Sequence, residues 1–288
     1  MKFLITGADG QLGRGWQRSL ESQPTDEFIA LNRQKLDICN PECIRKVLTE
    51  YKPDVCINTA AYTYVDNAEK EHDLAYRANV LGPKLLAEIC AQRGIQLVHY
   101  STDYVFSGKL SDREIYKDGY PEEAPTDPIN QYGASKLEGE KAVVSALPSA
   151  LIARVSWLCG LDGDNFVKSI IHRAKSSGQL QVVNDQFGIP CFVPYIIEQT
   201  RFLLHSRTSG LYHLGSKGCI TWYDFANKII EDAQLNVNVE AVDCSALSTQ
   251  AQRPYFSKLS TSKLEATGMS VPSWEIGCKT LVSDLIKV

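Results

Sequence analysis

Three side chains at characteristic intervals could carry out proton transfer in this chain. Tyr132 and Lys136 are four positions apart, so a helix would present the phenol and the ammonium on one face. Thr102 follows an apolar run that ends at Tyr100, where a strand would end. A tyrosine with a reference pKa of about 10 donates a proton poorly at neutral pH unless a cation stabilises its phenolate. These residues predict reduction of a carbonyl group, with Tyr132 as general acid, Lys136 as the cation and Thr102 as a hydrogen-bond donor to the carbonyl oxygen.

The N-terminal stretch is typical of a turn that binds phosphate. An apolar run over 2–6 predicts a buried strand, and apolar residues every third or fourth position over 12–20 predict a helix. Gly7, Gly10 and Gly13 lie between or within these elements, three positions apart. Such a turn directs backbone N–H groups and the positive end of the helix dipole to one point, and lets a pyrophosphate approach closely. We expect a dinucleotide there, although a tight strand–helix turn without ligand is the alternative.

The following segments alternate between strand-like and helix-like patterns. We expect further strands at 28–31, 54–58, 96–100 and 151–155, with helices at 41–51, 72–93 and 131–147. This alternation predicts an α/β fold on a doubly wound parallel sheet of the Rossmann type. Beyond 155 the pattern is mixed, with helices expected at 164–178, 195–206, 222–233 and 273–287 and strands at 180–183 and 211–214.

This change of pattern predicts two regions. The first is a dinucleotide-binding domain over residues 1–159, joined by later strands and a helix near 180–214. The second is a smaller, interleaved C-terminal substrate region that makes up most of 160–288. Residues 107–130 are polar and rich in Pro and Gly, and are too long for a structureless connector, which favours a functional loop or lid.

The composition argues against several classes of protein. The 288 residues are 44% hydrophobic and 22% charged, which is enough for a large core. A net charge of −4 without a basic run argues against nucleic acid as a partner. No apolar stretch approaches the ~20 residues of a membrane span, so we expect a cytoplasmic protein with no membrane contact. Nine cysteines without a CxxC pair and five scattered histidines predict free thiols and no bound metal.

The glycine turn, the Ser101-Thr102 pair and the Tyr132/Lys136 pair occur in the order of the extended short-chain dehydrogenase/reductases. Within that group the chain resembles the dTDP-4-dehydrorhamnose reductase family over nearly its whole length. The segments that carry the resemblance are Asn58-Thr-Ala-Ala-Tyr62, Val65-Asp66 with Ala68-Glu69, His99-Tyr-Ser-Thr-Asp-Tyr-Val-Phe106, Tyr132-Gly-Ala-Ser-Lys-Leu-Glu-Gly-Glu140, Arg154-Val-Ser-Trp157, Asn184-Asp-Gln186 and Gly210-Leu-Tyr-His-Leu214.

The resemblance implies reduction of a nucleotide-linked 4-keto-6-deoxysugar by NADPH or NADH, with dTDP-4-dehydrorhamnose giving dTDP-rhamnose as the first expectation. It implies catalytic roles for Thr102, Tyr132 and Lys136, and contacts of Thr102, Asp103 and Trp157 with the sugar. The cofactor-binding residues expected from the turn and the resemblance are Gly7, Gly10, Gln11, Leu12, Gly13, Asp37, Ile38, Ala60, Ala61, Tyr62, Thr63, Asn79, Tyr100, Tyr132 and Lys136. Asn79 matches an asparagine that often supports the catalytic lysine in such reductases.

Two further assignments rest on local charge. The strand at 28–31 is followed by Asn32 and Arg33, without the acidic residue that usually holds the ribose 2′-hydroxyl of NAD. A guanidinium can pair with a 2′-phosphate, so we expect NADPH to be preferred or at least accepted, with NADH as the alternative. Arg253, next to aromatic residues, offers a cation and a stacking surface to a nucleoside diphosphate.

The chain departs from the family pattern at a few positions. Phe256 stands where the family's Arg-Pro-x-Asn-Ser pattern has asparagine, and Cys191 where a small or hydroxyl residue is usual. Gly15 replaces a glutamate that some members use in metal-assisted dimerisation, so we expect no such metal site. A homodimer stays an open alternative.

Other functions are also compatible with parts of this pattern. A non-catalytic dinucleotide-binding subunit resembling the β subunit of methionine adenosyltransferase is one alternative, and the intact Thr102, Tyr132 and Lys136 favour an enzyme over it. An epimerase or dehydratase of the same fold is another. Dehydratases commonly carry an Asp-Glu pair after the strand-end threonine, and here Asp103 is followed by Tyr104. An exposed helix pair at Tyr132 and Lys136 is the simplest non-catalytic interpretation.

Overall fold

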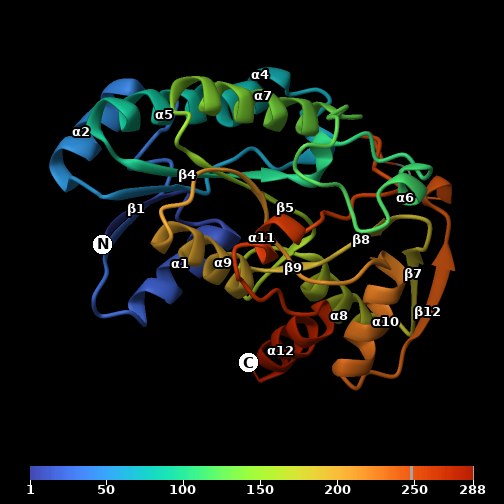
Figure 1. The fold of residues 1–288 in the computed structure, drawn as a ribbon. Coiled ribbons are helices and arrows are strands. Elements are labelled where there is room, and N and C mark those ends of the chain that lie inside the picture. Colours follow the sequence, from blue (N-terminus) through green and yellow to red (C-terminus); the bar gives the residue numbers. More distant parts are fainter. Residues whose placement is uncertain (247–248, 288) are drawn as a thin grey trace.

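The centre of the molecule is a sheet of six parallel strands in the order β10-β5-β4-β3-β1-β2 (Figure 1). The computed structural model describes residues 1–246 and 249–287. The strands of the sheet are β1 (Lys2–Thr6), β2 (Glu27–Leu31), β3 (Val55–Asn58), β4 (Gln96–Thr102), β5 (Leu151–Val155) and β10 (Gly210–His213). The chain leaves β1 toward β2 and then crosses to β3, which creates a switch point between β1 and β3. The predicted doubly wound Rossmann-type sheet is confirmed.

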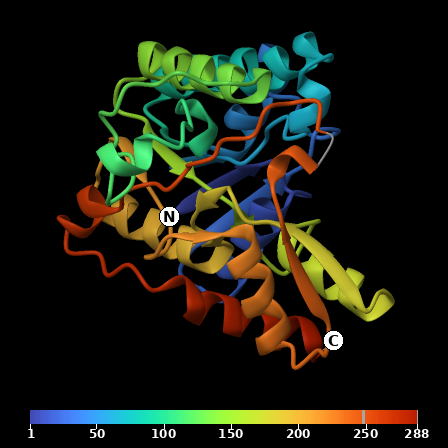
Figure 2. The ribbon, with the colours of Figure 1, turned by 90° about the vertical axis from the view of Figure 1, so that its right-hand side faces the viewer.

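Alternating side chains give this sheet two apolar faces. Phe3 and Ile5 of β1 belong to one apolar cluster, whereas Leu4 between them belongs to another. Both faces are covered by helices, as a parallel sheet requires (Figures 1 and 2). One cluster joins the sheet to α1 (Gln11–Glu21) and α9 (Val193–His205), and the other joins it to α2 (Pro41–Tyr51), α5 (Gly82–Arg93) and α7 (Gln131–Ala146).

The segment 72–93, expected as one helix, contains a short π-helical turn. It consists of α4 (His72–Tyr76), the π-turn Arg77–Leu81 and α5. Pro83 has no N–H to donate to the carbonyl of Asn79, and the wider turn is bonded from the Gly82 N–H to the carbonyl of Arg77. Gly139 of α7 lies against this turn, because a Cβ there would be 2.0 Å from the Asn79 oxygen. The absence of a Cβ at Gly139 thus lets α7 approach the π-turn closely.

The C-terminal half adds a further apolar cluster beside the two that cover the sheet. It joins α8 (Phe166–Ser176), α10 (Trp222–Asp232) and α12 (Trp274–Ile286) to β7 (Gln179–Val183), which pairs in parallel with β12 (Asn238–Val242). By contrast, β10 is a strand of the central sheet, and α9 packs on one face of that sheet. The smaller elements are β6 (Leu158–Cys159) with β9 (Cys191–Phe192), β8 (Phe187–Gly188) with β11 (Ile220–Thr221), α3 (Val65–Ala68), α11 (Ser262–Glu265) and the 3-10 turns Asp103–Val105 and Cys244–Ala246. The division into regions 1–159 and 160–288 stays a prediction.

Residues 107–130, expected to be a functional loop or lid, are fixed to the C-terminal part of the chain. They include the one-turn helix α6 (Asp112–Ile115). The Tyr120 N–H donates to the carbonyl of Lys258 over 2.9 Å, and the Tyr120 hydroxyl donates to the Asp112 carboxylate. Tyr120 is also 1% exposed. Residues 107–130 are therefore packed against the C-terminal part of the chain and do not form a free flap.

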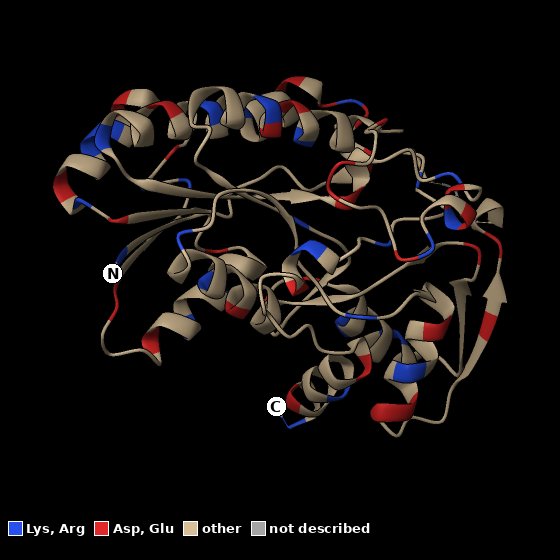
Figure 3. Cartoon of the chain, in the orientation of Figure 1, with Lys and Arg blue, Asp and Glu red and all other residues tan. Residues whose placement is uncertain are grey.

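Charged residues of both signs lie on helices of both layers, and the central strands carry few of them (Figure 3). Within residues 1–246 and 249–287, no helix has the length and apolarity that crossing a membrane requires. The expectation that nucleic acid is not a partner stays a prediction.

Candidate active site

The glycine turn between β1 and α1 has the form that close approach of a phosphate requires. Gly7 has a φ of 62°, and a Cβ there would lie 2.7 Å from the Ala60 nitrogen. A Cβ on Gly13 would lie 2.4 Å from the Gly7 oxygen. The first turn of α1 has no side-chain cap at Gly10, whereas α2, α7 and α8 are each capped by an asparagine. Its first N–H groups are left for an external acceptor, so the turn fits a dinucleotide pyrophosphate.

A cavity of about 650 Å³ lies next to this turn, where β4 and β5 end; we call it the central cavity. The predicted residues that line it are Gly10, Gln11, Leu12, Ala60, Ala61, Thr63, Tyr100, Thr102, Asp103, Tyr132, Lys136 and Trp157. The three predicted catalytic side chains are therefore in one cavity with the glycine turn, at the carboxyl ends of the strands.

A second cavity of about 420 Å³, the β2-side cavity, lies on the other side of the turn. The predicted residues that line it are Gly7, Gly10, Asn32, Arg33, Asp37, Ile38, Ala60, Ala61 and Tyr62. Gly10, Ala60 and Ala61 border both cavities, so the two flank the uncapped end of α1. An elongated ligand could place its phosphates there and one end in each cavity.

Thr102 and Tyr132 lie side by side in the central cavity. Burial raises the pKa of Tyr132 to about 12, a hydrogen bond with Thr102 lowers it, and the charge of Asp103 raises it. The Thr102 hydroxyl donates to Asp103 Oδ1 over 3.0 Å and accepts from the Tyr104 N–H over 3.2 Å. The rings of Tyr104 and Tyr132 meet edge-on with centroids 5.8 Å apart. The end of β4 thus orients the phenol that α7 supplies.

Lys136 is buried at the base of the same cavity. Its Nζ donates to the carbonyl of Tyr100 over 2.6 Å. Burial lowers the pKa of Lys136 to about 8, while the carboxylate of Glu140 raises it. Glu140 accepts two hydrogen bonds from Arg154, over 2.9 and 2.7 Å. In this geometry the ammonium is bonded to the backbone, and its role in stabilising the phenolate of Tyr132 stays a prediction.

Asp103 brings a carboxylate into the wall of the central cavity. It is 4% exposed, and burial raises its pKa to about 7 although hydroxyls of Ser257 and Thr102 oppose the rise. Its Oδ2 has no well-formed hydrogen bond to any residue within 1–246 and 249–287. This oxygen is a buried acceptor whose hydrogen-bonding capacity these residues leave unused.

Asn79, expected to support the lysine, holds the cavity wall. Its Oδ1 accepts from the Tyr62 N–H over 2.8 Å, and its Nδ2 donates to the Tyr62 carbonyl over 3.0 Å. The same Nδ2 donates to Ser135 Oγ over 3.0 Å, and Ser135 donates to the carbonyl of Tyr132. Asn79 thus links the Tyr62 loop to the first turn of α7, and none of these bonds reaches Lys136.

A third cavity of about 520 Å³, the distal cavity, lies beyond Trp157. Its lining includes Phe166, Arg173, Gln186, Trp222, Cys244, Arg253 and Tyr255. Trp157 stacks on Trp222 with ring centroids 3.5 Å apart and planes inclined by 10°. Trp157 also has a φ of 41°, a conformation that is unfavourable for a bulky residue and is concentrated at functional sites. The two indoles form a shared wall between the central and distal cavities.

Arg253 enters the distal cavity with one nitrogen fixed and one free. Its Nη2 donates to Asp66 Oδ2 over 2.8 Å, and Asp66 Oδ1 accepts from the Ala251 N–H over 2.9 Å. Arg253 Nη1 is buried without a hydrogen-bond partner in the part of the chain that the structure describes. A buried, unpaired guanidinium nitrogen favours an anionic ligand.

A family model described as the RmlD substrate binding domain matches residues 1–286. The chain belongs to this family. The RmlD-family chain is 35% identical to the dTDP-4-dehydrorhamnose reductase of Escherichia coli (strain K12) over 301 positions, which cover 99% of this chain and 98% of the relative. The family membership predicted from the sequence is thereby confirmed.

Two solved structures resemble this RmlD-family chain closely. The crystal structure of a dTDP-4-dehydrorhamnose reductase from Clostridium acetobutylicum is 38% identical with a TM-score of 0.94, covering 100% of each chain. The dTDP-4-dehydrorhamnose reductase from Bacillus anthracis, solved in complex with NADP, is 37% identical with a TM-score of 0.93, covering 100% of this chain and 99% of the other.

Sequence reasoning did not assign several residues that line the RmlD-family cavities. Tyr64 is 70% exposed and borders both the central and the β2-side cavities. Tyr104 directly follows Thr102-Asp103, and that position after a strand end was a usable signal. Arg173 and Trp222 carry no such local signal, because only the packing of α8 and α10 brings them to one cavity.

Proposed function

We propose that this protein is an NADPH-dependent oxidoreductase that reduces the 4-keto group of a nucleotide-linked 4-keto-6-deoxysugar. The expected substrate is dTDP-4-dehydrorhamnose and the expected product is dTDP-rhamnose. The observation that carries the proposal is the convergence of Thr102, Tyr132 and Lys136 on a cavity that adjoins the uncapped glycine turn. The names of the relatives in Escherichia coli and Clostridium acetobutylicum, and the NADP complex of the Bacillus anthracis enzyme, support it.

The residues of the central cavity divide the chemistry between them. NADPH, when bound, supplies a hydride for the carbonyl carbon. Tyr132 donates its phenolic proton to the carbonyl oxygen. Thr102, which lines the same cavity as this phenol, positions that oxygen and polarises the carbonyl. Lys136 carries its charge below its pKa of about 8 and favours the phenolate that Tyr132 leaves.

The adenosine end of the cofactor belongs in the β2-side cavity. Asp37 and Ile38 border the adenine there, and Arg33 and Arg77 line the same cavity. The carboxylate of Asp9, which also lines this cavity, already accepts a hydrogen bond from Asn32 Nδ2 over 2.9 Å. Two guanidinium groups favour a 2′-phosphate, so NADPH is the preferred cofactor and NADH the alternative.

The nucleotide end of the substrate belongs in the distal cavity. Arg253 lines this cavity and provides a guanidinium charge for the diphosphate, and Trp222 provides an aromatic surface. Trp157 and Asp103 border the sugar in the central cavity. The Trp157 indole also stacks on Trp222 of the distal cavity. This division assigns the chemistry to one cavity and the selection of the nucleotide to another.

The remaining expectations about this protein stay predictions. One cavity contains all three predicted catalytic residues, Thr102, Tyr132 and Lys136. This arrangement favours an enzyme over a non-catalytic dinucleotide-binding subunit. Asp103 is followed by Tyr104, so the chain lacks the Asp-Glu pair that dehydratases commonly carry after the strand-end threonine. The proposed reaction is a net reduction and not an epimerisation. Self-association as a homodimer and a cytoplasmic location are open to sedimentation and fractionation experiments.

The direct test is turnover of purified protein with NADPH, followed by nicotinamide absorbance. The substrates are dTDP-4-dehydrorhamnose, its counterparts on uridine and guanosine diphosphates, and the free 4-keto-6-deoxysugar. We expect oxidation of NADPH with the thymidine conjugate and little with the free sugar. Equal rates with the free sugar would refute the role of the distal cavity, and absence of turnover with every conjugate would refute the reductase.

A further inference from the structure

One stretch of chain, residues 157–166, borders both the central and the distal cavities; we call it the connecting segment. It begins with Trp157 and Leu158 in the wall of the central cavity and returns to that wall at Gly163 and Asp164. It ends with Phe166 in the wall of the distal cavity. Trp157 and Phe166 both pack on Trp222, with ring centroids 3.5 and 4.6 Å apart. A shift of this segment would therefore alter both walls.

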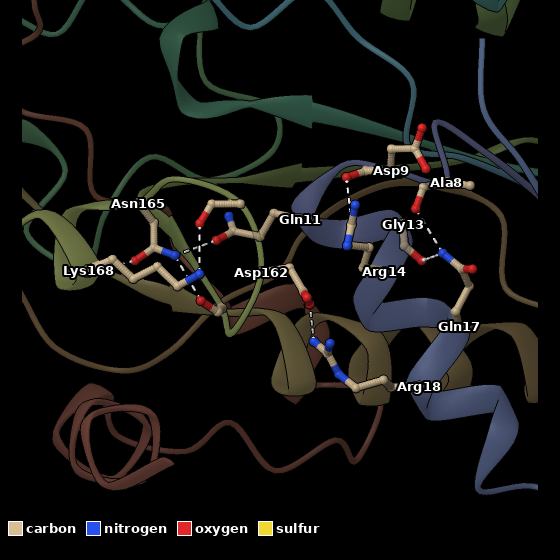
Figure 4. Close-up of polar contacts among 12 residues, drawn as sticks. Ala8, Asp9, Gln11, Gly13, Arg14, Gln17, Arg18, Asp162, Asn165 and Lys168 are labelled. Atoms are coloured by element: carbon tan, nitrogen blue, oxygen red, sulfur yellow. Dashed lines mark hydrogen bonds and ion pairs between the residues drawn. The ribbon is translucent and has the colours of Figure 1, made fainter. Parts of the chain in front are cut away.

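The connecting segment also wraps around Gln11 of the glycine turn (Figure 4). Gln11 Nε2 donates to the carbonyl of Leu158 over 3.0 Å, and Asn165 Nδ2 donates to Gln11 Oε1 over 2.8 Å. A Cβ on Gly160 or Gly163 would lie 3.4 or 3.3 Å from the Gln11 side chain. Both ends of the Gln11 amide are bonded to the segment, so the turn and the segment hold each other.

Asn165 extends this contact into α8. Its Nδ2 also donates to the carbonyl of Gly160 over 2.8 Å, and its Oδ1 caps α8 by accepting from the Lys168 N–H over 3.2 Å. Lys168 Nζ in turn donates to the carbonyl of Gly163 over 3.1 Å, as Figure 4 shows. One side chain thus fixes Gln11, the connecting segment and the first turn of the helix that carries Arg173 to the distal cavity.

We infer that Asn165 couples cofactor binding at the glycine turn to nucleotide binding in the distal cavity. A phosphate held at the first turn of α1 orders Gln11, and the Gln11–Asn165 hydrogen bond passes that order to the connecting segment and α8. Asn165 is a positioning residue in this scheme, since it lines neither cavity. The inference rests on the proposed function for the identity of both ligands.

This coupling has a reciprocal and measurable size. Each ligand must strengthen binding of the other by the same factor, because the coupling free energy is shared. The net contribution of one neutral hydrogen bond corresponds to roughly a two- to tenfold change in affinity. We expect dTDP to bind tighter by that factor when NADP⁺ is present, and NADP⁺ likewise when dTDP is present.

The experiment is calorimetric titration of the full chain with NADP⁺ and dTDP, each alone and with the other saturating. The variant Asn165→Ser keeps an N-cap acceptor, since serine caps helices about as well as asparagine, but its side chain is too short to bond Gln11. Asn165→Ala removes the cap as well. Asn40→Ser makes the same change at the cap of α2. Asn40 lines none of the three cavities itself but follows Cys39 of the β2-side cavity, so it serves as the matched control for loss of an asparagine cap that does not bond Gln11.

The expected result is coupling in the wild type and in Asn40→Ser, and no coupling in Asn165→Ser, whose affinities for single ligands stay within about twofold of the wild type. Coupling that persists in Asn165→Ser, or is lost only in Asn165→Ala, would show that Asn165 acts as a helix cap and would overturn the inference. Wild-type protein that binds both probes independently would overturn it too. Failure to bind NADP⁺ at all would instead refute the proposed function, and the inference with it.

Discussion

The central and distal cavities are built in different ways. Thr102, Asp103 and Lys136 in the central cavity are 5%, 4% and 2% exposed, and they come from the end of β4 and one helix packed on it. The distal cavity is bordered by α8, α10 and the stretch after β12, with Arg173 exposed and Arg253 partly exposed. Buried groups have shifted pKa values and fixed geometry, whereas exposed groups interact more weakly through water. Substitutions should therefore act on kcat in the central cavity and on KM in the distal one.

The largest expected effect comes from Tyr132→Phe. The change removes only the proton donor, and general acid catalysis is typically worth about 10²–10⁴-fold, so kcat should fall by that factor. The affinity for NADPH, measured by titration, should stay within about twofold because the ring remains. Tyr212→Phe, in β10 outside the described cavities, is the control for removing the hydroxyl of a buried tyrosine. A Tyr132→Phe enzyme with more than a tenth of wild-type kcat would contradict the assignment.

Asp103→Asn should give the next largest effect. Above its pKa of about 7 the carboxylate can accept a charge-assisted hydrogen bond from the sugar, and losing it should lower kcat/KM by roughly 10- to 100-fold. Wild-type kcat/KM should fall as the pH drops below 7, because Asp103 takes up a proton. The variant should lack that acidic limb, and a pH profile that keeps it would assign the limb to another group.

The same variant tests what burial of Asp103 costs in stability. Its pKa is raised from 3.8 to about 7, so the folded protein binds more protons than the unfolded chain between these values. The free energy of unfolding must then fall as the pH rises through that window. Asparagine does not titrate, so the Tm of Asp103→Asn should exceed that of the wild type at pH 8, and this advantage should shrink toward pH 4. An advantage that is constant with pH would show that ionisation is not its cause.

The central cavity could be predicted from sequence because its parts are local. The glycine turn joins one strand to the next helix, and Tyr132 and Lys136 are one helical turn apart in α7. The helix at 41–51 also has the predicted bounds, since Asn40 caps it and Pro41 begins it. In each case a short stretch of chain determines both the element and the direction of its side chains.

The distal cavity and the finer contacts depend on long-range packing. No local pattern marks β12, which is ordered by pairing with β7. The partners of Asn79 follow from the π-turn at 77–81, where Pro83 interrupts an otherwise regular helical pattern. The Asp66–Arg253 pair joins residues that are 187 positions apart in the sequence. Such contacts are set by the assembled fold, so sequence periodicity carries no signal for them.

Arg253→Ala should show the opposite kinetic split from Tyr132→Phe. Loss of a charge-assisted contact to a diphosphate should raise KM for the nucleotide-sugar at least about tenfold, with kcat and the affinity for NADPH little changed. Asp66→Asn is the matched control, because it weakens the hold on Arg253 and leaves the guanidinium in place. An equal rise in KM in Asp66→Asn would show that the pair matters by fixing the chain near Ala251 and not by binding phosphate.

The smallest effect extends the comparison to the β2-side cavity, where Arg33 is exposed. Its contact with a 2′-phosphate is screened by solvent, so Arg33→Ala should raise KM for NADPH by only about three- to tenfold. KM for NADH should hardly change, because that cofactor has a 2′-hydroxyl and no phosphate. Lys35→Ala removes a neighbouring exposed charge that does not line the cavity, and should alter neither constant. Steady-state assays with both cofactors measure this difference. Equal effects of Arg33→Ala on NADPH and NADH would show that the Arg33 guanidinium points into solvent. Arg77, which lines the same cavity, would then be the cation that selects the phosphate.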